Sequence, residues 1–368
     1  MIVRVREYKG KYRVVSLAFE EDVRDDLQKN ELDVIYVSDD SITLYPDNII
    51  ISRDKQIIEK LQQGNNYDVY ELGENGKLSE YYNDRSIDNY FFITGKCNSN
   101  CIMCPSPDVS RKNGEDISVE NLIEIAKHIP RDTPHLTITG GEPFMIGKEI
   151  FHFISFLRDK FENTEFLFLT NGRIFAVDSF AQQLRDCIPA DSIMAIPIHG
   201  SKPEIHDLIT QANNSFLQTV TGIKKLLRLG IRVELRIVVS NLNVNDIEDI
   251  SWLIVNEMSE ISYVSIMAME MTGSAYINRD KVWIPYREAA RKIQKAIMVF
   301  IEHGIDVKLY NFPLCTVEKK FWTLCEKSIS PEKVRYSKQC HICKMKKECG
   351  GIFAGTLLME KGELKAII

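Results

Sequence analysis

The sequence of 368 residues lacks the features that would place it in a membrane, in a secretory pathway or on nucleic acid. No apolar run approaches the roughly 20 residues that a membrane-spanning helix needs. The opening residues Met1–Arg6 lack the apolar core of a secretion signal. The formal net charge is −6, so no basic excess attracts nucleic acid or an anionic membrane. We therefore expect a cytoplasmic protein with neither nucleic acid nor a membrane among its partners.

The composition is otherwise that of an ordinary globular protein, with one exception. Hydrophobic residues make up 44% and charged residues 27% of the chain, which is long enough for more than one domain. The exception is the cysteine content. Nine cysteines in a chain without an export signal favour metal or redox chemistry over structural disulfides.

Residues 1–88 contain no cysteine and predict a small α+β module. Alternating apolar and polar residues over 2–6 and 11–17, around a Lys-Gly pair, predict a hairpin. Residues 41–52 predict two further short strands. The stretch 73–85, rich in Gly, Asn, Asp and Glu, is expected to be a linker.

From residue 89 the pattern changes to repeated strand–helix units, which indicate an α/β fold with a parallel sheet and crossover helices. Six units are too few for a closed eight-stranded barrel, so we expect a partial barrel over 89–304 and a cysteine-rich segment over 305–368. A single helix is expected over 286–303, and residues 305–310 can add a final strand. The module 1–88 would either dock a peptide or partner protein or simply cover the barrel edge. The predicted strands of the units are 90–94, 135–139, 165–169, 192–198, 233–239 and 263–269.

Three cysteines, Cys97, Cys101 and Cys104, follow the first of these strands at C-x3-C-x2-C spacing. Thiolates on one tight loop can hold an iron–sulfur cluster. Three ligands leave one iron of a four-iron cluster open to a small molecule, as in catalytic metal sites. The alternatives are three unrelated buried thiols and a zinc site. A zinc site would need a fourth protein ligand nearby, and no further Cys, His or Asp lies between Lys96 and Pro107.

A second motif, Gly140-Gly141-Glu142-Pro143, ends the next predicted strand. Two glycines let the backbone approach a ligand closely, and the carboxylate of Glu142 can accept from an ammonium group. Taken alone, this motif is better explained as a turn that carries a surface carboxylate. Its position one unit after the three-cysteine loop is what suggests a function.

A third constellation lies near the end of the sequence, where Cys315, Cys340, Cys343 and Cys349 supply four thiols. Four thiolates can close a 4Fe–4S cluster completely, or they can form a four-cysteine zinc knot. Cys325 is either a buried thiol or a ligand in place of Cys315.

Together these motifs closely resemble the radical S-adenosylmethionine (radical SAM) superfamily with a SPASM- or twitch-like C-terminal extension, over roughly residues 89–350. The resemblance implies a partial (β/α)6 TIM-like barrel. It also implies a 4Fe–4S cluster on the first three cysteines, with SAM at its open iron, and a second, auxiliary 4Fe–4S cluster on the last four. The residues it implies for SAM binding are Gly140, Gly141, Glu142, Thr170, Asn171, His199, Arg236, Ser240, Asn241 and Met269.

Two points about these residues stay open. Arg236 would counter the SAM carboxylate, but an ion pair with a neighbouring strand is an equal alternative. No catalytic base is assigned, because His199, His206, Asp207 and Glu270 all lie near strand ends, where polar side chains also have structural roles.

Several local runs are similar to the His-Xaa-Ser system radical SAM maturases of the HxsC type; they are 96–104, 136–143, 312–315, 328–330 and 348–351. This resemblance implies reductive cleavage of SAM to a 5′-deoxyadenosyl radical, which takes a hydrogen atom from a precursor peptide that is then oxidised or cross-linked. It also implies an electron donor such as flavodoxin or ferredoxin and a second radical SAM maturase as partners. The alternatives are a radical SAM enzyme for a small molecule, similar to the molybdopterin-precursor enzymes, and a non-catalytic iron–sulfur or zinc protein.

Overall fold

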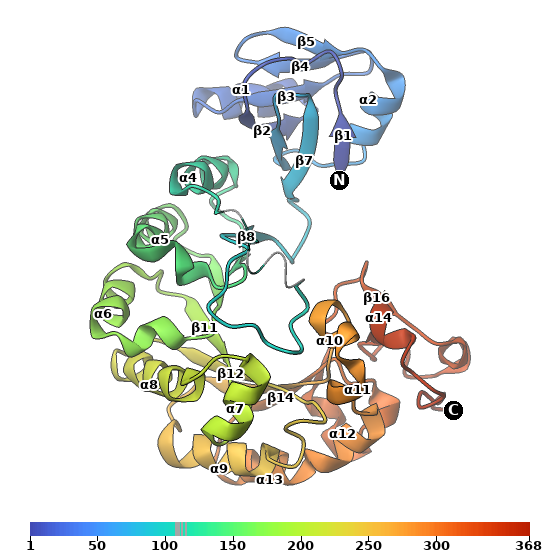
Figure 1. Cartoon of the computed structure of the whole chain (residues 1–368). Coiled ribbons are helices and arrows are strands. Elements are labelled where there is room, and N and C mark those ends of the chain that lie inside the picture. Colours follow the sequence, from blue (N-terminus) through green and yellow to red (C-terminus); the bar gives the residue numbers. More distant parts are fainter. Residues whose placement is uncertain (107–110, 112, 115) are drawn as a thin grey trace.

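The computed structural model describes residues 1–106, 111, 113–114 and 116–368. Figure 1 shows an N-terminal sheet module, a curved sheet with helices along its outer side, and a C-terminal segment beside the later strands of that sheet. None of the helices in the described ranges is long and apolar enough to cross a membrane.

The N-terminal module is a mixed sheet in the order β1-β7-β6-β2-β3-β4-β5, in which β2 and β3 are parallel and the other neighbours are antiparallel. Its core lies beneath helix α2 and includes the fully buried Val15, Leu61 and Leu72. The elements are β1 (Ile2–Arg4), β2 (Arg13–Ala18), α1 (Glu21–Lys29), β3 (Val34–Val37), β4 (Ile42–Tyr45), β5 (Ile49–Ser52), α2 (Lys55–Leu61), β6 (Val69–Leu72) and β7 (Lys77–Tyr82).

Two local predictions in this module are wrong. The first strand does not form a hairpin with the second, because β1 pairs with β7 in the register Ile2↔Ser79. The backbone N–H of Val5 extends this contact to the carbonyl of Gly76, whose φ of +74° suits glycine. The expected linker 73–85 therefore contains strand β7, which buries Leu78 and Tyr82. The strand pair at 41–52 is present as β4 and β5.

The barrel sheet runs β15-β14-β13-β12-β11-β10-β9-β8 with every neighbouring pair parallel, and it stays open between β8 and β15. The predicted partial α/β barrel is confirmed, and β14 is the expected final strand. The short β15 was not anticipated. The strands are β8 (Tyr90–Phe92), β9 (His135–Thr139), β10 (Glu165–Leu169), β11 (Ser192–Pro197), β12 (Val233–Val238), β13 (Tyr263–Met267), β14 (Val307–Tyr310) and β15 (Cys325–Glu326).

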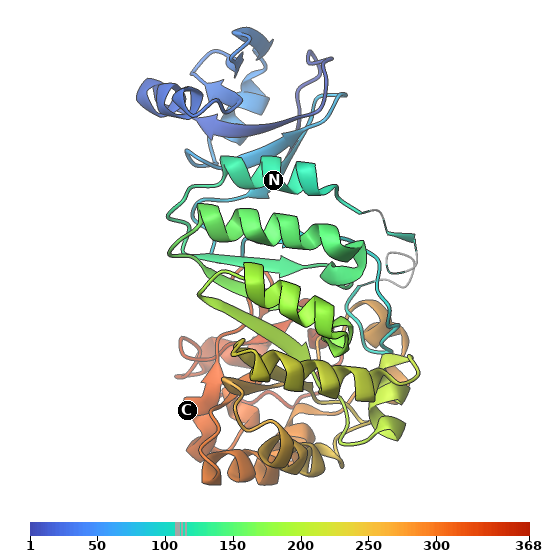
Figure 2. The ribbon, with the colours of Figure 1, turned by 90° about the vertical axis from the view of Figure 1, so that its left-hand side faces the viewer.

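Helices join these strands and cover the outer face of the sheet (Figures 1 and 2). The single helix expected over 286–303 is interrupted at Ile293, so that α12 and α13 take its place. The helices are α4 (Val119–His128), η1 (Pro143–Glu149), α5 (Ile150–Lys160), η2 (Arg173–Ala176), α6 (Asp178–Cys187), α7 (Pro203–Thr210), α8 (Ser215–Arg228), α9 (Ile247–Glu257), α10 (Gly273–Ile277), α11 (Arg279–Val282), α12 (Tyr286–Lys292) and α13 (Gln294–Glu302).

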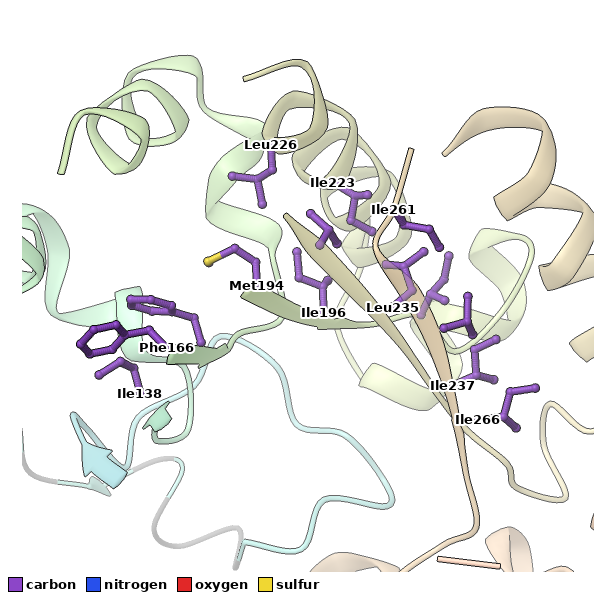
Figure 3. Close-up of a cluster of buried hydrophobic side chains, with 14 of the residues drawn as sticks. Ile138, Phe166, Met194, Ile196, Ile223, Leu226, Leu235, Ile237, Ile261 and Ile266 are labelled. Atoms are coloured by element: carbon purple, nitrogen blue, oxygen red, sulfur yellow. The ribbon is translucent and has the colours of Figure 1, made fainter. Parts of the chain in front are cut away.

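Side-chain alternation along each strand separates a core from a cavity. Figure 3 shows strand residues such as Leu235 and Ile237 gathered with Ile223 and Leu226 of α8 in the main core. The residues between them, such as Arg236, point to the opposite face of the sheet. This inner face is available for a ligand.

The N-terminal module packs on the barrel next to α4 (Figure 2). Ser16 Oγ lies 2.8 Å from His128 Nδ1 of that helix, and Tyr82 Oη lies 2.9 Å from Thr133 Oγ1. Val14 and Val69 belong to the same buried cluster as the barrel core. The module and the barrel are therefore joined by buried contacts.

The C-terminal segment is built from short elements that follow β14. They are η3 (Leu314–Thr316), η4 (Lys319–Leu324), β16 (Val334–Arg335), η5 (Lys338–Ile342), β17 (Ile352–Phe353) and α14 (Ala354–Leu357). Strands β16 and β17 pair antiparallel.

Candidate active site

The three thiols of the first cysteine loop lie near one another at the carboxyl end of the barrel strands. Cys101 is close enough to Cys104 and Cys97 for their charges to affect its ionisation. Burial raises the pKa of Cys97 to about 11 and that of Cys101 to about 12. These groups are therefore protonated as free thiols at neutral pH, and a metal must displace their protons to bind.

The backbone of this loop is fixed by two helices from the far side of the barrel. The N–H groups of Asn100 and Ile102 donate to the carbonyls of Thr210 and Ile209, each at 2.9 Å, at the end of α7. The carbonyl of Cys104 accepts from the N–H of Ser274 in α10 at 2.9 Å. The thiols are thus held by elements that are distant in sequence.

Side chains that follow β10 hold the same loop. Arg173 donates to the carbonyl of Asn98 at 2.5 Å and to Ser99 Oγ at 2.9 Å, and Asn171 Nδ2 donates to Asn98 Oδ1 at 2.6 Å. Asn171 was predicted to contact SAM, whereas Arg173 was missed. The available signal was its place two residues after Asn171 at the same strand end.

The two glycines of the second motif allow its turn to lie directly against the cysteine loop. A Cβ on Gly140 would lie 2.5 Å from the carbonyl oxygen of Thr94, and one on Gly141 would meet the carbonyl oxygens of Gly95 and Lys96. The N–H of Gly141 donates to the carbonyl of Thr94 at 2.7 Å. The glycines therefore permit a backbone contact between the two motifs.

Glu142 follows β9, is 1% exposed, and is linked by side-chain hydrogen bonds to the residues that follow β10. Its carboxylate accepts from Thr170 Oγ1 and from the N–H of Asn171, both at 2.7 Å. Burial raises the pKa of Glu142, and the hydrogen bonds from Asn171 and Thr170 oppose that rise. Three of the residues predicted for SAM binding therefore form one network, which places polar groups beside Cys97.

A cavity of about 730 Å³ lies inside the barrel, next to this loop. Cys101, Cys104, Met103 and Met269 line the end that faces the cysteine loop. The cavity continues past Arg236 toward the beginnings of the strands. It adjoins thiols at one end and is large enough for an extended small molecule or a peptide side chain.

Arg236 lines the cavity but is already paired. Its Nε and Nη2 atoms lie 2.8 Å and 3.1 Å from the two carboxylate oxygens of the fully buried Glu234, which also accepts from Tyr263 Oη at 3.2 Å. The ion-pair alternative is therefore present, with the partner on the same strand instead of a neighbouring one. Glu234 was missed, although alternation of charged and apolar residues in Val-Glu-Leu-Arg-Ile-Val is visible in the sequence.

His199 lines the cavity and is 3% exposed, and its Nδ1 is without a hydrogen-bond partner among the described residues. Burial lowers the pKa of His199 to about 3 and that of His206 to about 4, so both rings are neutral near pH 7. His206 Nδ1 accepts from the backbone N–H of His199 at 3.2 Å. Asp207 caps α8 by accepting from the N–H of Phe216 at 2.8 Å. His206 and Asp207 thus have structural partners.

The remaining predicted contacts differ in position. Ser240 is buried, and its hydroxyl donates to Asn243 Oδ1 at 3.0 Å. Asn241 is exposed. Of the residues predicted for SAM binding, His199, Arg236 and Met269 line the cavity. The others do not; they are Gly140, Gly141, Glu142, Thr170, Asn171, Ser240 and Asn241. Glu270 does line it, is partly buried and has a pKa raised by burial.

The C-terminal thiols form a separate site. Cys315, Cys340, Cys343 and Cys349 all line one small pocket of about 20 Å³. Cys325 instead lies in β15, where its thiol donates to the carbonyl of Phe321 at 3.7 Å. Burial raises the pKa of Cys325 to about 12, with a further contribution from Cys349. The four-cysteine set is therefore brought together, with Cys325 just outside it.

The donor sets of both sites consist of thiols, which are the ligands of iron–sulfur clusters. Within the described residues, no three His, Cys, Asp or Glu side chains are grouped so that they could hold one metal ion. A zinc ion needs its ligands around one point, whereas each thiolate of a cluster binds a different iron, so the sulfurs lie farther apart. All nine cysteines lie in described residues and are free thiols.

The fold is thus an open parallel barrel that carries a three-cysteine loop at its strand ends. The sequence of residues 91–253 matches the family model of the Radical SAM superfamily. The cofactors of that superfamily are a 4Fe–4S cluster and SAM, and the thiol loop and the adjacent cavity fit these groups.

Two curated relatives are both from Methanocaldococcus jannaschii. The uncharacterized protein MJ0907 is 25% identical over 177 residues, covering 46% of this chain and 59% of the relative. A probable GTP 3′,8-cyclase is 24% identical over 160 residues, covering 43% of this chain and 51% of the relative. The chain thus matches little more than half the length of these relatives.

Solved structures of SuiB from Streptococcus suis share the fold. SuiB bound to S-adenosylmethionine has a TM-score of 0.54 at 12% identity, with 85% of this chain and 80% of SuiB covered. SuiB bound to its precursor peptide SuiA has a TM-score of 0.50 at 11% identity, with 62% and 49% covered. At these identities the likeness concerns the fold alone.

Proposed function

We propose that this protein is a radical SAM enzyme that oxidatively modifies or cross-links a ribosomally made peptide. The observation that carries the proposal is the contact of the Gly140–Glu142 turn with the three-cysteine loop, whose Cys101 and Cys104 line a 730 Å³ cavity. A cluster on this loop, with SAM bound, supplies a carbon radical that takes a hydrogen atom from an unactivated carbon.

The residues of this chain position and protect that chemistry. Cys97, Cys101 and Cys104 hold the cluster, while Glu142 and the turn before it bind the amino group of SAM. The buried neighbours Met103 and Met269 cover the cavity wall with apolar surface. Such a wall excludes water from a reactive site. His199, with a neutral ring and an unpartnered nitrogen, is available to the same ligand.

The second cluster is assigned to Cys315, Cys340, Cys343 and Cys349. With four thiolate ligands this cluster would have no iron open to substrate, and it would take up the electron that the substrate radical gives up after losing a hydrogen atom. The wall between the sites is thin, since Glu326, Lys327 and Ser328 line the cavity while Gly350 packs on the backbone of Glu326 and Lys327. This arrangement supports electron transfer between them.

A peptide is the substrate we favour, for two reasons. The short runs similar to HxsC-type maturases point to a precursor with His-Xaa-Ser repeats, and the fold is shared with SuiB, which binds a precursor peptide. The N-terminal module would then contact the precursor or a second radical SAM maturase. A reduced flavodoxin or ferredoxin would supply electrons in the cytoplasm.

Anaerobic reconstitution with iron, sulfide, dithionite and SAM tests the reaction class. We expect 5′-deoxyadenosine well above background and about eight irons per chain, falling to about four when Cys97, Cys101 and Cys104 are all replaced by Ala. Absence of 5′-deoxyadenosine would refute the proposed radical SAM activity. Four irons with one zinc per chain would show that the second site is a four-cysteine zinc site. A mass change on a candidate repeat peptide tests the substrate.

A small-molecule substrate is the second candidate, because one curated relative is a probable GTP 3′,8-cyclase. The arginines that line the cavity are paired with carboxylates, which disfavours the binding of a triphosphate. Arg236 is paired with Glu234, and Arg232 Nη1 lies 2.6 Å from Asp191 Oδ1. Incubation of the reconstituted enzyme with GTP distinguishes the two, since a cyclised nucleotide product would overturn the peptide assignment.

A further inference from the structure

The chain returns to the C-terminal thiols after a turn at Gly362, whose φ is +80°. Leu364, Lys365 and Ile367 line the same small pocket as the four cysteines, and Leu364 is 3% exposed. The cover segment, defined here as Glu363–Ile367, therefore forms one wall of the thiol site. The cover segment follows the last of the motifs that were identified in the sequence.

The backbone of the cover segment lies beside two of the sulfurs. The N–H of Ile367 donates to Cys343 Sγ at 3.4 Å, while the N–H of Lys344 donates to the carbonyl of Ile367 at 2.9 Å. The backbone of Lys365 lies beside the thiol of Cys315 in the same pocket. The alternate residues 365 and 367 thus lie next to different thiols.

The cover segment is fastened to the barrel at its other end. The backbone N–H of Arg287 donates to Glu363 Oε2, and its side-chain Nε donates to the carbonyl of Glu363, both at 3.1 Å. The N–H of Leu364 donates to Glu360 Oε1 at 2.8 Å. Because α12 belongs to the barrel, these bonds tie the thiol site to the wall of the catalytic domain.

We propose that residues Glu363–Ile367 form part of the second cluster site. The N–H groups of Lys365 and Ile367 donate hydrogen bonds to the cluster sulfurs, and the segment closes the site to substrate. The proposal rests on the proposed function, because it takes the four thiols to be cluster ligands. It makes the second site an electron acceptor and excludes it as a substrate-binding centre.

Hydrogen bonds to the sulfurs change the reduction potential of the cluster in a predictable direction. Reduction adds negative charge to the cluster, and an N–H donor stabilises the more negative state, so the reduction potential rises. A closed site with two such donors therefore accepts an electron more readily. Proline at 365 or 367 removes the donor, whereas alanine keeps it.

The first experiment uses the metal-free full-length protein, so it does not depend on the cluster. Hydrogen exchange should be slow at the amides of Lys365 and Ile367. Replacement of Arg287 by Ala should speed it about tenfold, the effect of losing roughly one hydrogen bond. Rapid exchange of both amides in the wild-type protein would overturn the proposal.

The second experiment uses the reconstituted protein. Lys365→Pro and Ile367→Pro should each shift the potential of the second cluster to a more negative value, and Lys365→Ala and Ile367→Ala should leave it unchanged. Equal potentials for the Pro and Ala variants would overturn the proposal. A wild-type protein with only four irons would instead refute the second cluster, while the exchange result still decides whether the cover segment is fixed on the thiols.

Discussion

At position 141 the backbone of the turn lies so close to the cysteine loop that no side chain fits. A Cβ there would meet the carbonyl oxygens of Lys96 and Gly95, which are backbone atoms that cannot rotate away. Gly141→Ala should therefore displace the loop and lose the first cluster, leaving about four of about eight irons. Iron analysis after reconstitution measures this.

The matched control for that substitution is Gly73→Ala. A Cβ on Gly73 would meet only ordinary contacts, the nearest at 3.4 Å. The control should keep its full iron content and its melting temperature. Full iron in Gly141→Ala would show that the loop can shift without losing its ligand geometry, and would contradict the role assigned to the glycine.

Glu142 allows a test of whether its charge serves SAM or only the fold. Glu142→Gln keeps an acceptor for the N–H of Asn171 or for Thr170 but removes the charge. Loss of a charged hydrogen bond to the SAM ammonium should weaken SAM binding by about 1.5–3 kcal/mol, or roughly 10- to 100-fold. Calorimetric titration of SAM into the reconstituted protein measures it, with the exposed Glu149→Gln as the control.

If Glu142→Gln lowers only the melting temperature and leaves the SAM affinity intact, its carboxylate is a structural link between β9 and β10. Both outcomes are compatible with its burial, so the affinity decides between them. A lost affinity in Glu149→Gln as well would point to a general defect of the turn.

The residues that the sequence could predict are those whose chemistry is local. Cysteine spacing, two adjacent glycines and the polar strand ends Thr170 and Asn171 are visible in short stretches, and the structure brings them into one site. Arg173 was missed because its function depends on a loop far away in sequence. Glu234 was missed because a buried carboxylate is unexpected until its partner Arg236 is seen on the same inner face.

At the scale of elements, the barrel was predictable and the N-terminal pairing was not. Alternation of buried strands with amphipathic helices fixes a parallel sheet by local pattern alone. Pairing of β1 with β7 joins residues far apart in the chain, and no turn between them indicates it. Strand β7 also carries Ser79 and Glu80, polar residues that made the stretch resemble a linker.

The N-terminal module and the barrel share part of one core, and this predicts that they unfold together. Tyr82 is 2% exposed, belongs to the barrel cluster and bonds Thr133 through its hydroxyl. Tyr82→Ala should cost about 3–5 kcal/mol, as for other large buried aromatics. Tyr82→Phe should cost about 1 kcal/mol, since only the hydrogen bonds of the hydroxyl to Thr133 and Asp84 are lost.

Urea unfolding followed by fluorescence and by circular dichroism measures both variants. The two signals should coincide in one transition that shifts as a whole, and the exposed Ile49→Ala should leave it in place. A module that serves only to dock a partner would give a separate early transition in Tyr82→Ala, with the barrel transition unchanged.

For the whole molecule, the two buried histidines at the barrel mouth predict how stability depends on pH. Burial lowers the pKa of His199 to about 3 and that of His206 to about 4, below the unfolded value of about 6.5. Between about pH 6.5 and 4 the unfolded chain therefore binds more protons than the folded one, so stability rises with pH in that window. The stability that the two neutral histidines contribute is complete above about pH 6.5 and is lost as the pH falls.

The measurement is the melting temperature of the metal-free protein between pH 7 and 4.5, which separates this effect from acid loss of clusters. His206→Asn keeps an acceptor for the backbone N–H of His199 and cannot titrate, so its melting temperature should fall less steeply with acid. The removed slope should approach about 1.4 kcal/mol per pH unit. His152→Asn, at an exposed position, should follow the wild-type profile, and an unchanged slope in His206→Asn would show that the buried pair does not control acid stability.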